Sequence, residues 1–206
     1  MVITRFVVAT LIVVSMASAT AQQLIDRIVA RVGTETITLS DVQAAIGLGI
    51  VDVRAGQNAQ QAAIPQLIDR QLILAEVARF PPPDPAPAAI AAEADRLKMA
   101  AGTRLAQLMD ATGLDASRLN DIARDSLRIQ GYLAQRFGTT VQVSDAEARE
   151  YFREHTEEFR RNGVQMSFDE AESLVRERAA DERRSATIAK WLSDLRARAE
   201  VVELPL

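Results

Sequence analysis

His155 is the only histidine of the chain, and cysteine is absent, so few residues could act as a metal ligand or a nucleophile. His155 lies four residues after Tyr151 and four before Phe159, so in a helix the three rings would share one face. Catalytic zinc sites usually combine two or three histidines or cysteines. We therefore interpret His155 as a packing residue, and neither a metal nor a pH-sensing role has a second feature to support it.

Carboxylates gather in the same region and could in principle supply the acid and base of a glycosidase. They are Glu147, Glu150, Glu154, Glu157 and Glu158. Arginines interleave with them at positions 149, 153, 160 and 161. This spacing is typical of a solvated helix face with ion pairs that each contribute a few tenths of a kcal/mol.

Other chemistry-bearing motifs are missing from the sequence, including a phosphate-binding Gly-x-x-x-x-Gly-Lys loop and a Gly-x-Ser-x-Gly elbow. Trp191, Leu192 and Leu195 could bind an apolar segment of another chain, although we favour a role in anchoring the last helix to the core. We predict no catalytic, cofactor-binding or metal-binding residues, no cofactor and no enzymatic activity.

The amino-terminal residues have the pattern of a secretory signal peptide. Arg5 precedes an apolar run over Phe6–Val14, and Ala19-Thr20-Ala21 supplies a signal-peptidase site. We expect a signal peptide over residues 1–21, cleavage after Ala21 and a periplasmic location. No later stretch reaches the ~20 apolar residues of a membrane span, so we expect a soluble mature chain.

Charge argues against nucleic acid as a partner. Of the 24 basic residues Arg5 is lost with the signal, which leaves 23 against 28 acidic residues, with the two signs interspersed. The 48% apolar and 25% charged composition is that of a globular protein.

The elements begin with alternating apolar residues over 25–39, which predict a β-hairpin turning at Gly33-Thr34. Ser40, with Gln43 three residues later, predicts a capped helix start, and a second helix is expected from about Pro65 to Arg79. The proline-rich segment 80–87 predicts a stiff extended connector. A spacer is favoured there over a ligand for another protein's aromatic groove.

Helices dominate the remainder. We expect them over 88–112 with a break near Gly102, over 116–137, from the Ser144 capping box to about Phe159, and from the Ser167 capping box to about Ala199. The charged middle of the last helix, 176–184, predicts a solvated span between packed ends. Residues 200–204 predict a strand that covers the hairpin. The fold class is thus mostly α, with a small β-hairpin, a C-terminal strand and a long C-terminal helix.

Several segments, in order behind the signal peptide, resemble the SurA-type periplasmic chaperones and related parvulins. They are Asp26–Gly33 with Ile37–Val42, Leu67–Ile73, Gly113-Leu114 with Tyr132–Phe137, Val143–Glu147 with Tyr151-Phe152, and Ser167–Ala171 with Lys190–Val201. The resemblance implies one chaperone domain over 22–206, comprising the hairpin and first helices (22–79), the connector (80–87), a helical body (88–159) and the last helix and strand (167–206).

One departure from that family bears on activity. Isomerase-bearing relatives carry a parvulin domain between the counterparts of 151–159 and 167–168, whereas only residues 160–166 separate them here, which we expect to be a loop. The resemblance thus implies an ATP-independent chaperone for unfolded outer-membrane or secreted proteins, without prolyl isomerase activity. An isomerase homologue with residual activity is a remote alternative.

Two other functions stay open. A dedicated assembly partner of one exported protein would form a tight stoichiometric complex, and an enzyme would need a pocket where acidic groups converge. Either a monomer or a dimer that swaps the last helix fits the sequence.

Overall fold

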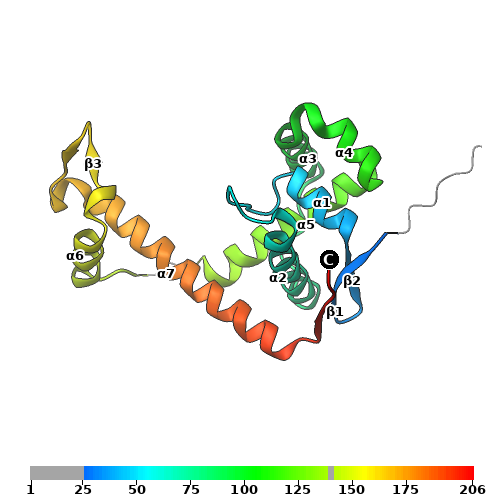
Figure 1. Ribbon diagram of the computed structural model, residues 1–206. Coiled ribbons are helices and arrows are strands. Elements are labelled where there is room, and N and C mark those ends of the chain that lie inside the picture. The colour runs from blue at the N-terminus through cyan, green and yellow to red at the C-terminus, as the bar shows by residue number, and fades with distance from the viewer. Residues whose placement is uncertain (1–25, 139–141) are drawn as a thin grey trace, which may run out of the picture.

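The chain is mostly helical, as predicted, and folds into a large body and a smaller distal lobe joined by one long helix (Figure 1). The computed structural model describes residues 26–138 and 142–206. The expected signal peptide and its cleavage after Ala21 lie outside these residues. Within them, no helix is both long and apolar enough to cross a bilayer.

A three-stranded antiparallel sheet closes one side of the body. Strands β1 (Ile28–Val32) and β2 (Glu35–Thr38) form the predicted hairpin, and β5 (Val201–Glu203) pairs with the other edge of β1, so the order is β2-β1-β5. Gly33 has a φ of 58° at the two-residue turn, a conformation that glycine adopts without strain. The predicted hairpin and C-terminal strand are both confirmed.

Helix α1 (Leu39–Gly47) begins two residues earlier than a cap at Ser40 predicts. The hydroxyl of Thr38, not Ser40, accepts from the Asp41 N–H, and the Asp41 carboxylate accepts from the Thr38 N–H at 2.9 Å. Ser40 instead bonds the Asp26 carboxylate through its hydroxyl and its N–H. The predicted Ser40 cap was wrong because Ser40 is bound to Asp26, while Thr38 and Asp41 form the capping box.

Helix α2 (Ala59–Arg79) also begins earlier than predicted. Asn58 caps it by accepting from the Gln61 N–H at 3.2 Å, so Pro65 lies in the second turn rather than the first. Proline there removes one helical hydrogen bond. Burial on both sides of it, at Ala63, Ile64, Leu67 and Ile68, keeps the helix continuous.

Beyond Phe80, the predicted extended connector is confirmed up to Ala86. Pro87 is the first residue of α3 (Pro87–Ala101). Pro82 is buried against Gly131 of the later helix, where a Cβ added to Gly131 would lie 3.4 Å from the Pro82 Cβ. The predicted break at Gly102 is a short 3₁₀ turn, η1 (Gly102–Arg104), before α4 (Leu105–Thr112). Asp115 then caps α5 (Ala116–Phe137).

The distal lobe contains α6 (Asp145–Glu154), the 3₁₀ turn η2 (Thr156–Glu158), the two-residue strands β3 (Arg160–Arg161) and β4 (Val164–Gln165), and the first half of α7 (Phe168–Arg198). Both predicted capping boxes, at Ser144 and Ser167, are confirmed. The expected helix to Phe159 ends instead at Glu154, because His155 leaves helical geometry. Residues 160–166 are a small hairpin rather than a plain loop, turning at Asn162-Gly163 with positive φ at both.

Helix α7 belongs to both halves of the molecule. Its amino-terminal part buries Ala171 and Val175 in the lobe, and its carboxyl-terminal part buries Trp191 and Leu195 in the body. None of the residues between Val175 and Trp191 is buried. The predicted solvated span between packed ends is confirmed.

Candidate functional site

His155, the first residue expected to show chemistry, packs in the distal lobe. Its ring stacks on Tyr151 with centroids 4.1 Å apart, and Tyr151 also meets Phe159 edge-on at 6.2 Å. The Nδ1 atom lies 3.1 Å from the Tyr151 carbonyl oxygen, and Nε2 lies 3.9 Å from Glu182. The predicted packing role is confirmed. Across residues 26–138 and 142–206, no group of three or more potential ligand side chains is arranged to hold a metal.

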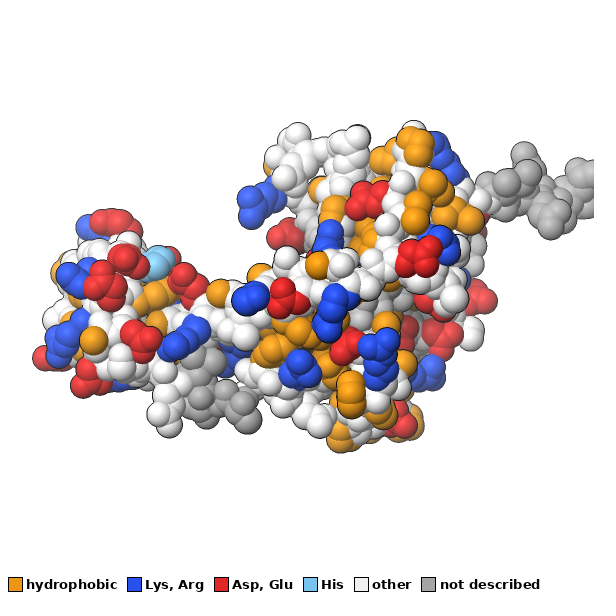
Figure 2. Space-filling view, turned by 90° about the horizontal axis from the view of Figure 1, so that it is seen from below, with side chains coloured by type: hydrophobic (Ala, Val, Ile, Leu, Met, Phe, Trp, Pro, Cys, Tyr) orange, Lys and Arg blue, Asp and Glu red, His pale blue; other side chains and the backbone are white. Residues whose placement is uncertain are grey.

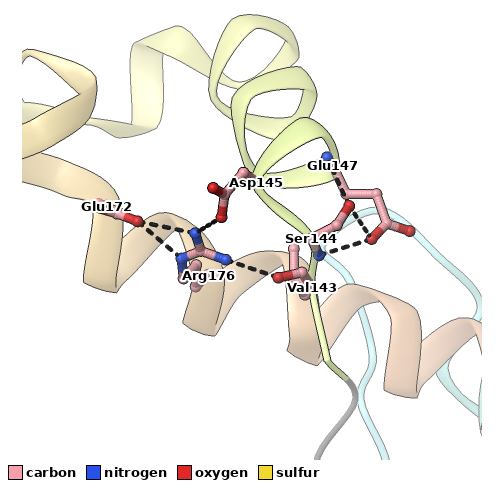
Figure 3. Close-up of polar contacts among 6 residues, drawn as sticks. All are labelled: Val143, Ser144, Asp145, Glu147, Glu172 and Arg176. Carbon is pink, nitrogen blue, oxygen red and sulfur yellow. Dashed lines mark hydrogen bonds and ion pairs between the residues drawn. The ribbon is translucent and has the colours of Figure 1, made fainter.

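The acidic residues near His155 make ion pairs and helix caps. Glu157 pairs with Arg160 at 2.7 Å, Glu150 pairs with Arg153, and Glu147 accepts from the Ser144 N–H at 2.9 Å. Arg176 of α7 binds the start of α6 by donating to the Val143 carbonyl at 2.7 Å and to Asp145 (Figure 3). The predicted solvated, ion-paired face is confirmed.

Trp191 lies in the body with 9% of its surface exposed. Its ring packs 5.3 Å from that of Phe137 and 5.9 Å from that of Tyr132. The predicted anchoring role is confirmed, and the indole is covered rather than presented to a ligand.

A cleft of about 320 Å³ lies elsewhere in the body, between β2, α1, α2 and α5. We call it the central cleft. Its apolar lining comes from all four elements and the segment after α1: Ile37, Ala44, Ala45, Ile50, Leu67, Leu74 and Ile122. Its polar lining consists of Glu35, Thr36, Asp41, Arg70, Gln71, Arg118, Asp121 and Asp125.

Three of the charged residues that line the cleft form ion pairs within the protein. Arg118 of α5 binds Asp41 of α1, which links the two helices across the cleft. Asp121 accepts from Arg124 on the next turn of α5 at 2.7 Å. These four side chains therefore have partners within the protein.

Arg70 and Arg118 are the two cations that line the cleft, and of these Arg70 forms no ion pair with another described residue. Its Nη2 donates to the Ile122 carbonyl and to the Ser126 hydroxyl, both at 3.1 Å, and both acceptors are neutral. Burial lowers the pKa of Arg70 below its ordinary value, and the nearby carboxylates of Asp125 and Glu93 oppose that shift. A guanidinium has five N–H donors, so Arg70 retains donors for a ligand.

Asp125 is the complementary acceptor in the cleft. Burial raises its pKa above the ordinary value, while Arg70 and Arg128 act in the opposite direction. It forms no ion pair in the part of the chain that the structure describes, and it lines the same cleft as Arg70. The cleft thus combines an apolar lining with one donor group and one acceptor group.

The sequence analysis did not single out Arg70 and Asp125, which become candidates only in the structure. A usable signal was present in α2, where Arg70 lies between Leu67 and Leu74 at helical spacing and so places a charge on an apolar face. Asp125 gave no such signal, because α5 carries charges along most of its length. Only the packing of α5 on α2 brings the two residues together.

No protein-family model matches the chain, and no curated protein gives a significant match to it. The central cleft and the arrangement of the body and the distal lobe are therefore the features that bear on function.

Proposed function

We propose that the protein is an ATP-independent periplasmic chaperone that holds unfolded outer-membrane or secreted polypeptides. The central cleft carries this proposal. A polypeptide in non-native form offers apolar side chains together with amide donors and carbonyl acceptors. The cleft offers the complement, an apolar lining beside the donors of Arg70 and the carboxylate of Asp125. Such binding tolerates many sequences, as a chaperone requires.

The arrangement of the lobes supports the same proposal. The distal lobe projects from the body on the solvent-exposed middle of α7, which leaves an open angle between the two halves (Figure 1). Charged side chains cover much of the lobe, whereas apolar side chains gather on the body (Figure 2). A client held against the body would thus lie beside a charged lobe that stays solvated.

The proposal includes the absence of prolyl isomerase activity. In the SurA-type proteins that the sequence resembles, the isomerase domain would stand where residues 160–166 stand here. These residues form the β3–β4 hairpin, in which Met166 donates its N–H to the Phe159 carbonyl at 2.9 Å. A hairpin of this size encloses no catalytic pocket.

Dilution of an unfolded outer-membrane protein, followed by light scattering with and without the mature chain and without nucleotide, tests the proposal. We expect suppressed aggregation at modest molar excess, and no acceleration in a parallel proline-isomerisation assay. Undiminished scattering at several-fold excess would contradict the chaperone function and favour a dedicated partner of one exported protein. Accelerated isomerisation would contradict the second part of the proposal.

A further inference from the structure

We infer that the central cleft binds its ligand as an extended strand added to the free edge of β2, so that the clients it selects are segments able to form β-structure. This inference rests on the proposed chaperone function and names the conformation of the ligand. It is carried by the register of the sheet, by the position of Thr36 and by the two charged groups without ion pairs.

The register of the sheet shows which backbone groups are free. Gly33 donates its N–H to the Glu200 carbonyl at 2.8 Å, and Leu204 donates to the Val29 carbonyl at 2.9 Å. Arg31 pairs with Val202 midway between these two bonds, so its N–H and C=O point toward β5. Thr36 lies opposite Arg31 on β2. Thr36 must therefore direct its own N–H and C=O away from β1, on the outer side of the sheet.

Thr36, with its outward N–H and C=O, borders the central cleft. It lines the central cleft together with its neighbours Glu35 and Ile37, and β2 is an edge strand of the sheet. The Thr38 N–H further along β2 is occupied, since it donates to Asp41 at 2.9 Å. The edge therefore offers one complete pair of backbone hydrogen bonds, at Thr36, and this single pair would set the register of an added strand.

An added strand also explains the two unpaired charges on the far wall. A peptide paired with β2 would lie ~4.8 Å from it, and its second edge would face α2 and α5. The amide and carbonyl groups of that second edge would be shielded from water and would need partners. Arg70 supplies donors for the carbonyls, and Asp125 supplies an acceptor for the amides.

Other ligands use these groups less well. A helical segment satisfies its own backbone groups, so it would leave Thr36, Arg70 and Asp125 unpaired. An acidic ligand would form an ion pair with Arg70 but would be repelled by Asp125 and by the exposed Glu35 at the rim. The cleft therefore favours an extended peptide without a strong charge.

A matched pair of variants of the mature chain tests the inference, with a labelled peptide of alternating valine and threonine flanked by serines as the probe. Thr36→Pro removes the outward N–H at an edge position where proline is tolerated, whereas Thr36→Val keeps it. We expect the proline variant to bind the peptide about five- to tenfold more weakly than the valine variant, as for the loss of one hydrogen bond. Equal affinity of the two folded variants would overturn the inference.

A second measurement decides the matter if the proline variant does not fold. The natural chain is titrated with the same peptide and with a version N-methylated at every second residue, which cannot pair along one edge. We expect the methylated peptide to bind at least about fivefold more weakly, and undiminished binding would overturn the inference. If the natural chain suppresses aggregation while either test gives the overturning result, only the strand-addition inference fails. If it neither suppresses aggregation nor binds the peptide, the proposed function itself fails.

Discussion

The body and the distal lobe are held together by different forces. The body almost completely buries apolar side chains from its sheet and helices, including Val29, Leu48, Ile68, Val77 and Leu97. Among the described residues of the lobe, only Ala148, Phe159, Ala171 and Val175 are fully buried, and capping boxes and the ion pairs of Arg176 surround them. Because apolar burial is the larger contribution per residue, the lobe should unfold first and should respond more strongly to salt and acid.

The largest expected effect comes from Phe159→Ala. Phe159 is 1% exposed and packs 5.3 Å from the Phe152 ring, so we expect the lobe to lose about 3–5 kcal/mol, enough to unfold it. Trp191 is the only tryptophan and lies in the body, so its fluorescence transition should keep its midpoint while helical circular dichroism falls earlier. Ile68→Ala in the body is the control and should shift the Trp191 transition. A shift with Phe159→Ala of similar size would mean that the halves unfold as one unit.

Arg176→Ala should have the next largest effect. Arg176 donates to Asp145, to Glu172 at 2.9 Å and to the Val143 carbonyl at 2.7 Å (Figure 3). Loss of these bonds should destabilise the lobe, and the α6 amides should then exchange their hydrogens faster. The control is Arg183→Ala, which breaks one exposed pair with Glu147 and should cost less than about 1 kcal/mol. Equal hydrogen-exchange protection of the α6 amides in the two variants would show that Arg176 is not the specific link between α7 and α6.

The capping boxes should contribute a smaller amount each. Ser144→Ala and Ser167→Ala each remove the hydroxyl that accepts from the third helical N–H, which should cost about 1 kcal/mol. Exchange of the first-turn amides of α6 or α7 should accelerate in the corresponding variant alone. Acceleration spread evenly over the body as well would contradict the separation of the two halves.

Acid should distinguish the halves by the direction of their pKa shifts. The Arg176 guanidinium lowers the pKa of Asp145, the Ser144 backbone N–H lowers that of Glu147, and the Ser167 hydroxyl lowers that of Glu170. A lowered pKa contributes stability above the ordinary carboxyl value of ~4, and that stability is lost as the pH falls through the folded pKa.

The body contains shifts in both directions. Salt-bridging by Arg96 lowers the pKa of Glu93, whereas burial raises the pKa of Asp125, so protonation of Asp125 favours the folded state. Below about pH 4 we therefore expect the lobe to lose more stability than the body, as followed by α6 amide exchange against Trp191 fluorescence. Parallel loss in both halves would contradict this expectation.

Local signals in the sequence predicted most of the fold. Apolar alternation, Gly102, and the serines at 144 and 167 each act through their own neighbours, and each predicted element is present. Predictions failed where two local signals competed: Thr38 displaced Ser40 as a cap, and Asn58 began α2 ahead of Pro65. The central cleft could not be predicted, because Thr36, Arg70 and Asp125 meet only through the packing of β2, α2 and α5.

The pairing of β5 with β1 has a consequence for the order of folding. Arg31 and Glu200 form an ion pair across 169 residues of sequence, and Trp191 fills the core beneath the same sheet. During synthesis the first strand must therefore wait for the last helix and strand before its core can close, whereas the contacts of the lobe join residues closer in sequence. The body of such a chain stays incompletely folded until its C-terminal segment is made. The pairing of β5 with β1 is then slow, because it joins segments far apart in sequence.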